Sequence, residues 1–588
     1  MERYCDIVMK GGITSGVVYP LAAVELAKEH RFRNIGGTSA GAIAAAAVAA
    51  AELGRRSGAN PKAYERIAEL PGWLGGNMVT LFQPSRRMRP FFNTLLAGLG
   101  GGLPRKLAAP LNGFPVAAIV GLLPAIALIV AALLLDGDGA LQWVAIAVGA
   151  AVLAPVGVLG AIVISALWRL RGLPDSYYGI CSGNDRGGGA ADAPLTRWLA
   201  DLLDELAHGD PGKGPLTFGE LWRLEEPDGE RGVELRMMTT CLSQGRPYSL
   251  PFEGGEELWF DPDELRDLFP ARVVDHMVAQ APADGNRGGL LRLPPAAQMP
   301  VVVAARMSLS FPLLIGAVPL YAENHAWEGE PRLERCWFSD GGITSNFPVH
   351  FFDSPVPRWP TYAINLIPLS PDRNLDPEDQ SKNVWMPTDN SQGTAEAWVG
   401  WEDEKARKQI SFFFGSIFRT AQNWIDNRQM RGPGHRDRIA HVRLADYEGG
   451  MNLSMERETI ERLAERGASA AEQLSARFAS SPPTDTELTW ANQRWIRYRT
   501  FMALVERQSQ QALRGFDDGD SGAPISELNS RPLGTPPGYG WQDEEQKAFA
   551  IAETAQMLAL FGRWKDGDRE FGAEAPEPPI RPWSIPRI

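Results

Sequence analysis

The sequence predicts an α/β fold that is interrupted by an apolar insertion and followed by a helical C-terminal region. Two strand–turn–helix units open the chain, a distant apolar strand ends in another glycine-rich turn, and two long uncharged runs lie between them. Strands that alternate with helices are typical of α/β proteins. We therefore expect one large α/β domain that carries an insertion.

The first unit contains a mostly apolar strand at 4–9, a glycine-rich turn at 10–16 and a helical segment at 17–30. Glycine has no Cβ, so the backbone N–H groups of Gly11 and Gly12 can approach an oxyanion closely. A phosphate-binding loop is the alternative interpretation. That motif requires a Lys-Ser/Thr pair, and none follows this turn. The turn is therefore a candidate oxyanion loop.

The second unit places the pentapeptide Gly-Thr-Ser-Ala-Gly at 37–41, between a short strand at 32–35 and an alanine-rich helix at 40–53. Strand, tight turn and helix form the context of a nucleophile elbow, in which Ser39 is the nucleophile. In a chain with 61 glycines such a pentapeptide also arises by chance. The flanking strand and helix therefore carry the assignment.

The neighbours of Ser39 fit this role. Gly37 and Gly41 leave space around a serine that must occupy a strained turn with its hydroxyl clear of the backbone. Ala40 begins the helix, and N–H groups at a helix N-terminus favour developing negative charge. The candidate oxyanion donors are therefore Gly11, Gly12 and Ala40.

The base that activates Ser39 is not an obvious histidine. None of the seven histidines falls in a catalytic signature, and the elbow follows only the second strand, which argues against the usual Ser-Asp-His order. A strand at 336–339 ends in Asp340, followed by Gly341 and Gly342. Asp-Gly pairs elsewhere resemble ordinary turns, at Asp136, Asp138, Asp228, Asp284, Asp518 and Asp566. Asp340 differs because an apolar strand precedes it and two glycines follow it.

This combination resembles the patatin-like phospholipase family. Further stretches at 215–222, 246–252, 305–312 and 452–453 look similar as well. The resemblance implies a three-layer αβα sandwich with a central, mostly parallel sheet. It also implies a Ser39–Asp340 dyad that works without histidine, in which Asp340 takes the Ser39 proton and later activates water.

The glycine-rich turn departs from the family pattern. The family's third glycine and its basic residue correspond to Ile13 and Ser15, and Lys10 is the cation available to compensate. An aspartate with the reference pKa of roughly 3.9 is a weak base toward a hydroxyl. We therefore expect a partly desolvated Asp340 and a strong dependence on oxyanion stabilisation.

Two uncharged runs at 114–135 and 140–168 are each long enough to cross a bilayer as a helix. A short turn containing Asp136 and Asp138 joins them, so we predict a transmembrane helical hairpin. Both flanks are basic, with Arg86, Arg87, Arg89, Arg105, Lys106, Arg169 and Arg171. By the positive-inside rule, the catalytic domain and both termini are cytoplasmic. The alternative is a buried hairpin in a soluble core.

Composition limits the remaining possibilities. A net charge of −13 argues against nucleic acid as a partner, and four scattered cysteines give no metal spacing and suit a reducing compartment. We expect no metal and no cofactor. We divide the chain into a first catalytic part at 1–107, the hairpin at 108–172, a second catalytic part at 173–480 and a C-terminal region at 481–588.

Three helices are expected late in the chain, at 402–429, 488–513 and 544–561. The first carries an aromatic face that we expect to lie in the core, with contact to the membrane as the alternative: Phe412, Phe413, Phe414, Ile417, Phe418 and Trp424. Residues beyond about 483 leave the family resemblance. A regulatory protein partner or a homo-oligomer is a hypothesis that rests on this unassigned region.

The sequence thus predicts a membrane-anchored serine acyl hydrolase of the phospholipase A type, whose partners are membrane glycerophospholipids and the bilayer. One alternative is a lysophospholipase or general esterase for which the hairpin is only an anchor. Another is a catalytically silent, membrane-tethered interaction protein, which the altered turn makes conceivable.

Overall fold

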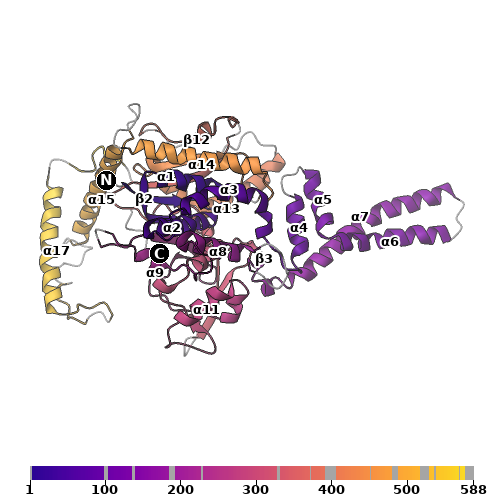
Figure 1. Ribbon diagram of the computed structural model, residues 1–588, viewed down its shortest axis with the longest axis horizontal. Helices are drawn as coiled ribbons and strands as arrows, with labels where there is room; N and C mark the ends of the chain where they lie inside the picture. Colours follow the sequence, from indigo (N-terminus) through magenta and orange to yellow (C-terminus); the bar gives the residue numbers. More distant parts are fainter. Residues whose placement is uncertain are drawn as a thin grey trace.

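The computed structural model describes residues 3–12, 14–98, 103–134, 139–184, 193–226, 229–326, 332–370, 373–390, 392, 406–450, 452–479, 488–516, 529–534, 538–567 and 570–576. These residues form a mixed α/β body from which one helical hairpin projects (Figure 1). The predicted α/β class is confirmed. Ile13 and the turn between the apolar runs lie outside the described residues.

One large sheet has the strand order β12-β13-β11-β1-β2-β4-β10-β9-β6-β7, with β5 beside β4. Its centre is parallel and consists of β13 (Ile439–Leu444), β11 (Thr361–Pro368), β1 (Arg3–Met9), β2 (His30–Gly37) and β4 (Glu234–Cys241). Antiparallel strands extend it: β5 (Arg246–Leu250), β6 (Leu258–Phe260), β7 (Leu291–Arg292), β9 (Val318–Asn324), β10 (Arg332–Asp340) and β12 (Val384–Trp385). A separate pair joins β3 (Gly179–Cys181) to β8 (Leu313–Ile315).

The helices of the body are α1 (Tyr19–Ala27), α2 (Ala40–Ser57), α3 (Ala63–Asn77), α8 (Leu195–His208), α9 (Phe218–Trp222), α10 (Pro262–Arg266), α11 (Ala271–Gln280), α12 (Val301–Ser308) and α14 (Arg457–Arg477). Side chains on β1 alternate between the two faces of the sheet. Ile7 and Met9 join the main helical core, whereas Val8 packs with Phe347 and Met430. Both faces of the parallel centre are therefore covered.

The predicted hairpin is formed by α6 (Pro115–Leu134) and α7 (Ala140–Leu170), which extend away from the body (Figure 1). Their mean hydropathy reaches 2.8 and 2.4, and only 17% and 6% of those windows are buried. Both helices are thus long and apolar enough to cross a membrane. The two helices are in backbone contact at Gly121 and Gly157, because a Cβ on Gly121 would lie 2.5 Å from the Gly157 carbonyl oxygen. Two further helices, α4 (Arg89–Gly98) and α5 (Leu103–Gly113), stand beside the base of this hairpin (Figure 1).

Late helices form where they were predicted, as α13 (Ala406–Met430), α15 (Trp490–Gly515) and α17 (Glu544–Lys565). The expectation that the aromatic face of α13 lies in the core is wrong for the described side chains, since Phe413, Phe414, Ile417 and Trp424 are 49–58% exposed. The reason is that α13 packs on the body through another face, which carries Asp426 and Met430. The side chains of Phe412 and Phe418 lie outside the described residues.

Candidate active site

Ser39 lies in the sharp turn between β2 and α2. Its backbone has φ 55° and ψ −129°, a strained conformation for a residue with a side chain, and only 4% of the residue is exposed. The flanking glycines are sterically required. A Cβ on Gly37 would lie 2.3 Å from the Gly41 carbonyl oxygen, and one on Gly41 would lie 2.4 Å from the Met9 carbonyl oxygen. The turn therefore has the geometry of a nucleophile elbow.

Asp340 ends β10, and its carboxyl lies within hydrogen-bonding reach of the Ser39 side chain. Its Oδ1 accepts a 2.7 Å hydrogen bond from the Gly342 N–H. Its Oδ2 is buried without a fully formed hydrogen bond to any described residue. Burial raises the pKa of Asp340 to about 7, and the Ser39 side chain and the Gly342 N–H partly oppose this increase. Of the two carboxylate oxygens, one is thus held by the Gly342 N–H and the other is not.

The end of α12 fixes both members of this pair. Ser39 donates its N–H to Ser308 Oγ at 3.1 Å, and Asp340 donates its N–H to the Ser310 carbonyl oxygen at 3.0 Å. Arg306 is fully buried and binds Ser310 Oγ at 2.7 Å. Residues 305–312 were recognised only as part of the family resemblance, and these contacts were not predicted from the sequence.

The glycine-rich turn lies directly against Ser39. A Cβ on Gly11 would lie 2.9 Å from Ser39 Cβ and 2.2 Å from Asn346 Oδ1. The Gly11 N–H donates to the Asn346 carbonyl oxygen at 2.8 Å, so this predicted oxyanion donor is occupied in the described conformation. The N–H groups of Gly12 and Ala40 have no hydrogen-bond acceptor among the described residues. Two of the three predicted donors therefore remain available.

Lys10 does not replace the missing basic residue of the turn. Its ammonium donates to Asn365 Oδ1 at 2.8 Å and to the Leu366 carbonyl oxygen at 3.0 Å, both on β11. Burial lowers its pKa to about 8, and the charge of Asp426 partly opposes this decrease. Lys10 thus holds the start of the turn against the sheet.

The loop after Asp340 is tied to α13 by a buried carboxylate that sequence reasoning missed. Asp426 accepts hydrogen bonds from Ser345 Oγ at 2.7 Å, from the Asn346 N–H at 2.7 Å and from the Phe347 N–H at 2.9 Å. Gln422, one turn earlier, donates to the Gly342 carbonyl oxygen. A Cβ on Gly341 would lie 2.1 Å from the Met238 carbonyl oxygen, so this glycine is required.

An apolar cavity of about 110 Å³ opens beside the elbow. Its lining includes Gly16 and Ala40, the neighbour of Ser39 in the chain, together with Leu81 and Phe82. Phe82 belongs to the same buried cluster as Ala40 and as Phe92 on α4. Phe82 thus links the cavity wall to the packing of α4.

Comparison with known proteins places the chain in a family. The RpoH suppressor of Rhizobium meliloti (strain 1021) is 36% identical over an alignment that covers 98% of both chains. The chain belongs to the RpoH suppressor family. No protein-family model matches it. The crystal structure of VipD from Legionella pneumophila aligns with 96% of this chain and 85% of that chain, at 13% identity and a TM-score of 0.31.

The described parts of this RpoH suppressor family member contain no group of three His, Cys, Asp or Glu side chains that could hold a metal ion. The four cysteines are buried free thiols.

Proposed function

We propose that this protein is a membrane-anchored serine acyl hydrolase of the phospholipase A type, with a patatin-like αβα fold. The observation that carries the proposal is the buried, incompletely bonded Asp340 carboxylate beside the strained Ser39. A carboxyl with a pKa near 7 is a better base toward a hydroxyl than an exposed aspartate is. Nearby glycine backbone and the N-terminus of α2 suit the negative charge that forms during ester cleavage.

In the proposed reaction, Asp340 takes the Ser39 hydroxyl proton as Oγ attacks the ester carbonyl. The tetrahedral oxyanion accepts hydrogen bonds from the Gly12 and Ala40 N–H groups. The ester C–O bond then breaks, and the alcohol leaves with the proton returned by Asp340. Water, deprotonated by Asp340, attacks the acyl-serine; the bond between the acyl carbon and Ser39 Oγ then breaks, the fatty acid leaves and Asp340 returns the proton to Ser39 Oγ.

Glycerophospholipids fit the surroundings of this site. The apolar cavity beside Ala40 can accept an acyl chain, and Phe82 in its wall packs in one buried cluster with Phe92 on α4, which stands beside the base of the hairpin (Figure 1). Arg86, Arg89, Arg105 and Lys106 are exposed around that base, where anionic headgroups lie if α6 and α7 cross the membrane. This charge distribution supports a cytoplasmic body. Tethering also raises the local concentration of the lipid substrate.

Two alternatives to a phospholipase A are considered. A lysophospholipase or general esterase would use the same dyad and treat the hairpin as an anchor. A catalytically silent interaction protein is favoured by the occupied Gly11 N–H and by the missing basic residue in the turn. The exposed faces of α13 and α17 are where a regulatory partner or a second copy would bind.

The deciding experiment uses the full-length protein in detergent or reconstituted bilayers. A fluorophosphonate probe should label the wild type and should not label Ser39→Ala. Incubation with mixed phospholipid and lysophospholipid vesicles, followed by identification of released fatty acids, separates the two hydrolase candidates. Absence of labelling and of fatty-acid release in a folded wild type would support the silent protein.

A further inference from the structure

The segment at 445–450 follows β13 and contacts the C-terminal end of the glycine-rich turn, at Thr14 and Ser15. Asn346 contacts the other end of the turn, at Gly11. Thr14 donates both its N–H and its Oγ1–H to the Gly450 carbonyl oxygen, at 3.2 Å and 3.1 Å. A Cβ on Gly449 would lie 2.8 Å from Ser15 Cβ. The segment, here called the clamp loop, therefore lies in direct contact with the candidate oxyanion loop.

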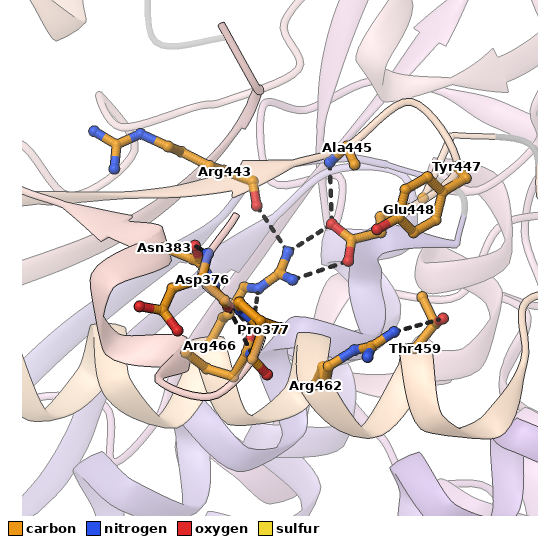
Figure 2. Close-up of polar contacts among 12 residues, drawn as sticks. Asp376, Pro377, Asn383, Arg443, Ala445, Tyr447, Glu448, Thr459, Arg462 and Arg466 are labelled. Atoms are coloured by element: carbon orange, nitrogen blue, oxygen red, sulfur yellow. Dashed lines mark hydrogen bonds and ion pairs between the residues drawn. The ribbon is translucent and has the colours of Figure 1, made fainter. Parts of the chain in front are cut away.

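A buried ion pair fixes the clamp loop to α14 (Figure 2). Arg466 donates to both Glu448 carboxylate oxygens, at 2.6 Å and 2.9 Å, and Glu448 also accepts the Ala445 N–H at 3.0 Å. Arg466 further binds Gln380 Oε1 at 2.7 Å and the Arg443 carbonyl oxygen at 3.0 Å. Both charged residues are at most 3% exposed. A bidentate guanidinium–carboxylate pair with these extra bonds has one well-defined geometry.

The backbone next to Glu448 makes this contact possible. Gly449 and Gly450 have φ values of +88° and +63°, in the region that favours glycine. The pair of glycines turns the chain so that the Gly450 carbonyl faces Thr14 while Gly449 lies flat against Ser15. Glu448 is held by Arg466 on α14, and the two glycines after it contact the turn at 10–16. A shift of α14 would therefore move the clamp loop and the turn with it.

We propose that Arg466 and Glu448 are positioning residues for the oxyanion donors, acting through Gly449 and Gly450 on the turn at 10–16. Oxyanion stabilisation depends on donors held at hydrogen-bonding distance from the charge that forms, so a small displacement of the turn reduces the rate of acylation. Neither residue touches the substrate. The inference rests on the proposed hydrolase activity and assigns a role to a part of the chain that follows Asp340 by about a hundred residues.

The first test compares Arg466→Lys with Arg462→Lys in the full-length protein. Lysine keeps the charge but loses the bidentate fork. Arg462 lies one turn away on α14, pairs with Glu458 on the surface and serves as the matched control. We expect Arg466→Lys to slow fluorophosphonate labelling of Ser39 at least tenfold, and Arg462→Lys to stay within twofold of wild type. With a soluble ester, kcat should fall while KM is unchanged, because the clamp loop acts on the oxyanion donors.

The second test covers the case in which Arg466→Lys does not fold. Gly449→Ala pushes a methyl group against Ser15, whereas Gly58→Ala adds the same strain at φ +75° in open space at the far end of α2. We expect a tenfold loss of labelling rate only for Gly449→Ala, with both variants folded at the assay temperature as judged by their melting curves. A folded Gly449→Ala protein that labels at the wild-type rate overturns the proposal. A folded wild type that does not label at all overturns the hydrolase assignment instead.

Discussion

The buried carboxylate of Asp340 makes a prediction about stability as well as activity. Its pKa is about 7 in the folded protein and 3.8 in its ordinary state. A carboxyl with a raised pKa binds its proton more tightly in the folded state, so its contribution to stability is lost as pH rises between the two values. The free energy of unfolding should fall by about 2 kcal/mol between about pH 5 and about pH 7 because of this one carboxyl. Asp340→Asn does not ionise and should not show this loss.

The assay is therefore a pair of melting curves in detergent, for wild type and Asp340→Asn, at each pH. The melting temperature of Asp340→Asn minus that of the wild type should increase as pH rises, because only the wild type has to ionise a buried carboxyl at position 340. The pH dependence of kcat/KM gives an independent readout. Wild-type activity should increase about tenfold per pH unit below about pH 7 and then level off, because Asp340 must be deprotonated to act as a base. Asp340→Asn should be inactive.

Asp6 provides the matched control. Burial raises its pKa to about 7 as well, but its oxygens bind Trp359, Asn34 and Thr361 rather than Ser39. Asp6→Asn should leave the pH profile of activity unchanged. A melting-temperature difference between wild type and Asp340→Asn that does not vary with pH would refute the raised pKa. Near-normal activity of Asp340→Asn would refute its role as the base.

Two further predictions concern the cavity and the hairpin. Ala44→Leu places a larger side chain in the cavity wall and should reduce hydrolysis of long-chain esters more than hydrolysis of short-chain esters. The measurement is the ratio of the kcat/KM values for the two esters. An unchanged ratio would show that the acyl chain does not bind in this cavity. For topology, a membrane-impermeant maleimide applied to intact cells should label Leu141→Cys, near the hairpin turn, and should not label Arg105→Cys, at its base. The opposite pattern would reverse the proposed orientation.

The sequence predicted Ser39 and Asp340 because each lies in a backbone setting that restricts residue type. Gly37, Gly41 and Gly341 are required by contacts with neighbouring carbonyl oxygens, and such requirements leave a readable pattern of glycines. The two apolar helices were predictable for a similar reason, since length and hydropathy are local properties.

The supporting residues could not be predicted in this way. Asp426 and Gly450 act on loops that lie far from them in the chain, and nothing in their local sequence indicates those contacts. The occupied Gly11 N–H was missed for the same reason, because its acceptor is the backbone of Asn346. The exposed face of α13 shows a related limit. Periodicity identifies an apolar face but does not say what covers it.

Strand register explains how residues so distant in sequence form one site. In the parallel centre of the sheet, Gly37 at the end of β2 is level with Met237 on β4. The antiparallel strand β10 arrives from the other side, and its last residue, Asp340, is level with Thr239, two positions beyond Met237. Position 39 is likewise two residues beyond Gly37, so Asp340 and Ser39 lie at the same level of the sheet, just past the end of β2. Because side chains alternate along a strand, a slip of one residue between β4 and β10 would turn Asp340 to the opposite face. The pairing of these two strands thus determines whether Asp340 reaches Ser39.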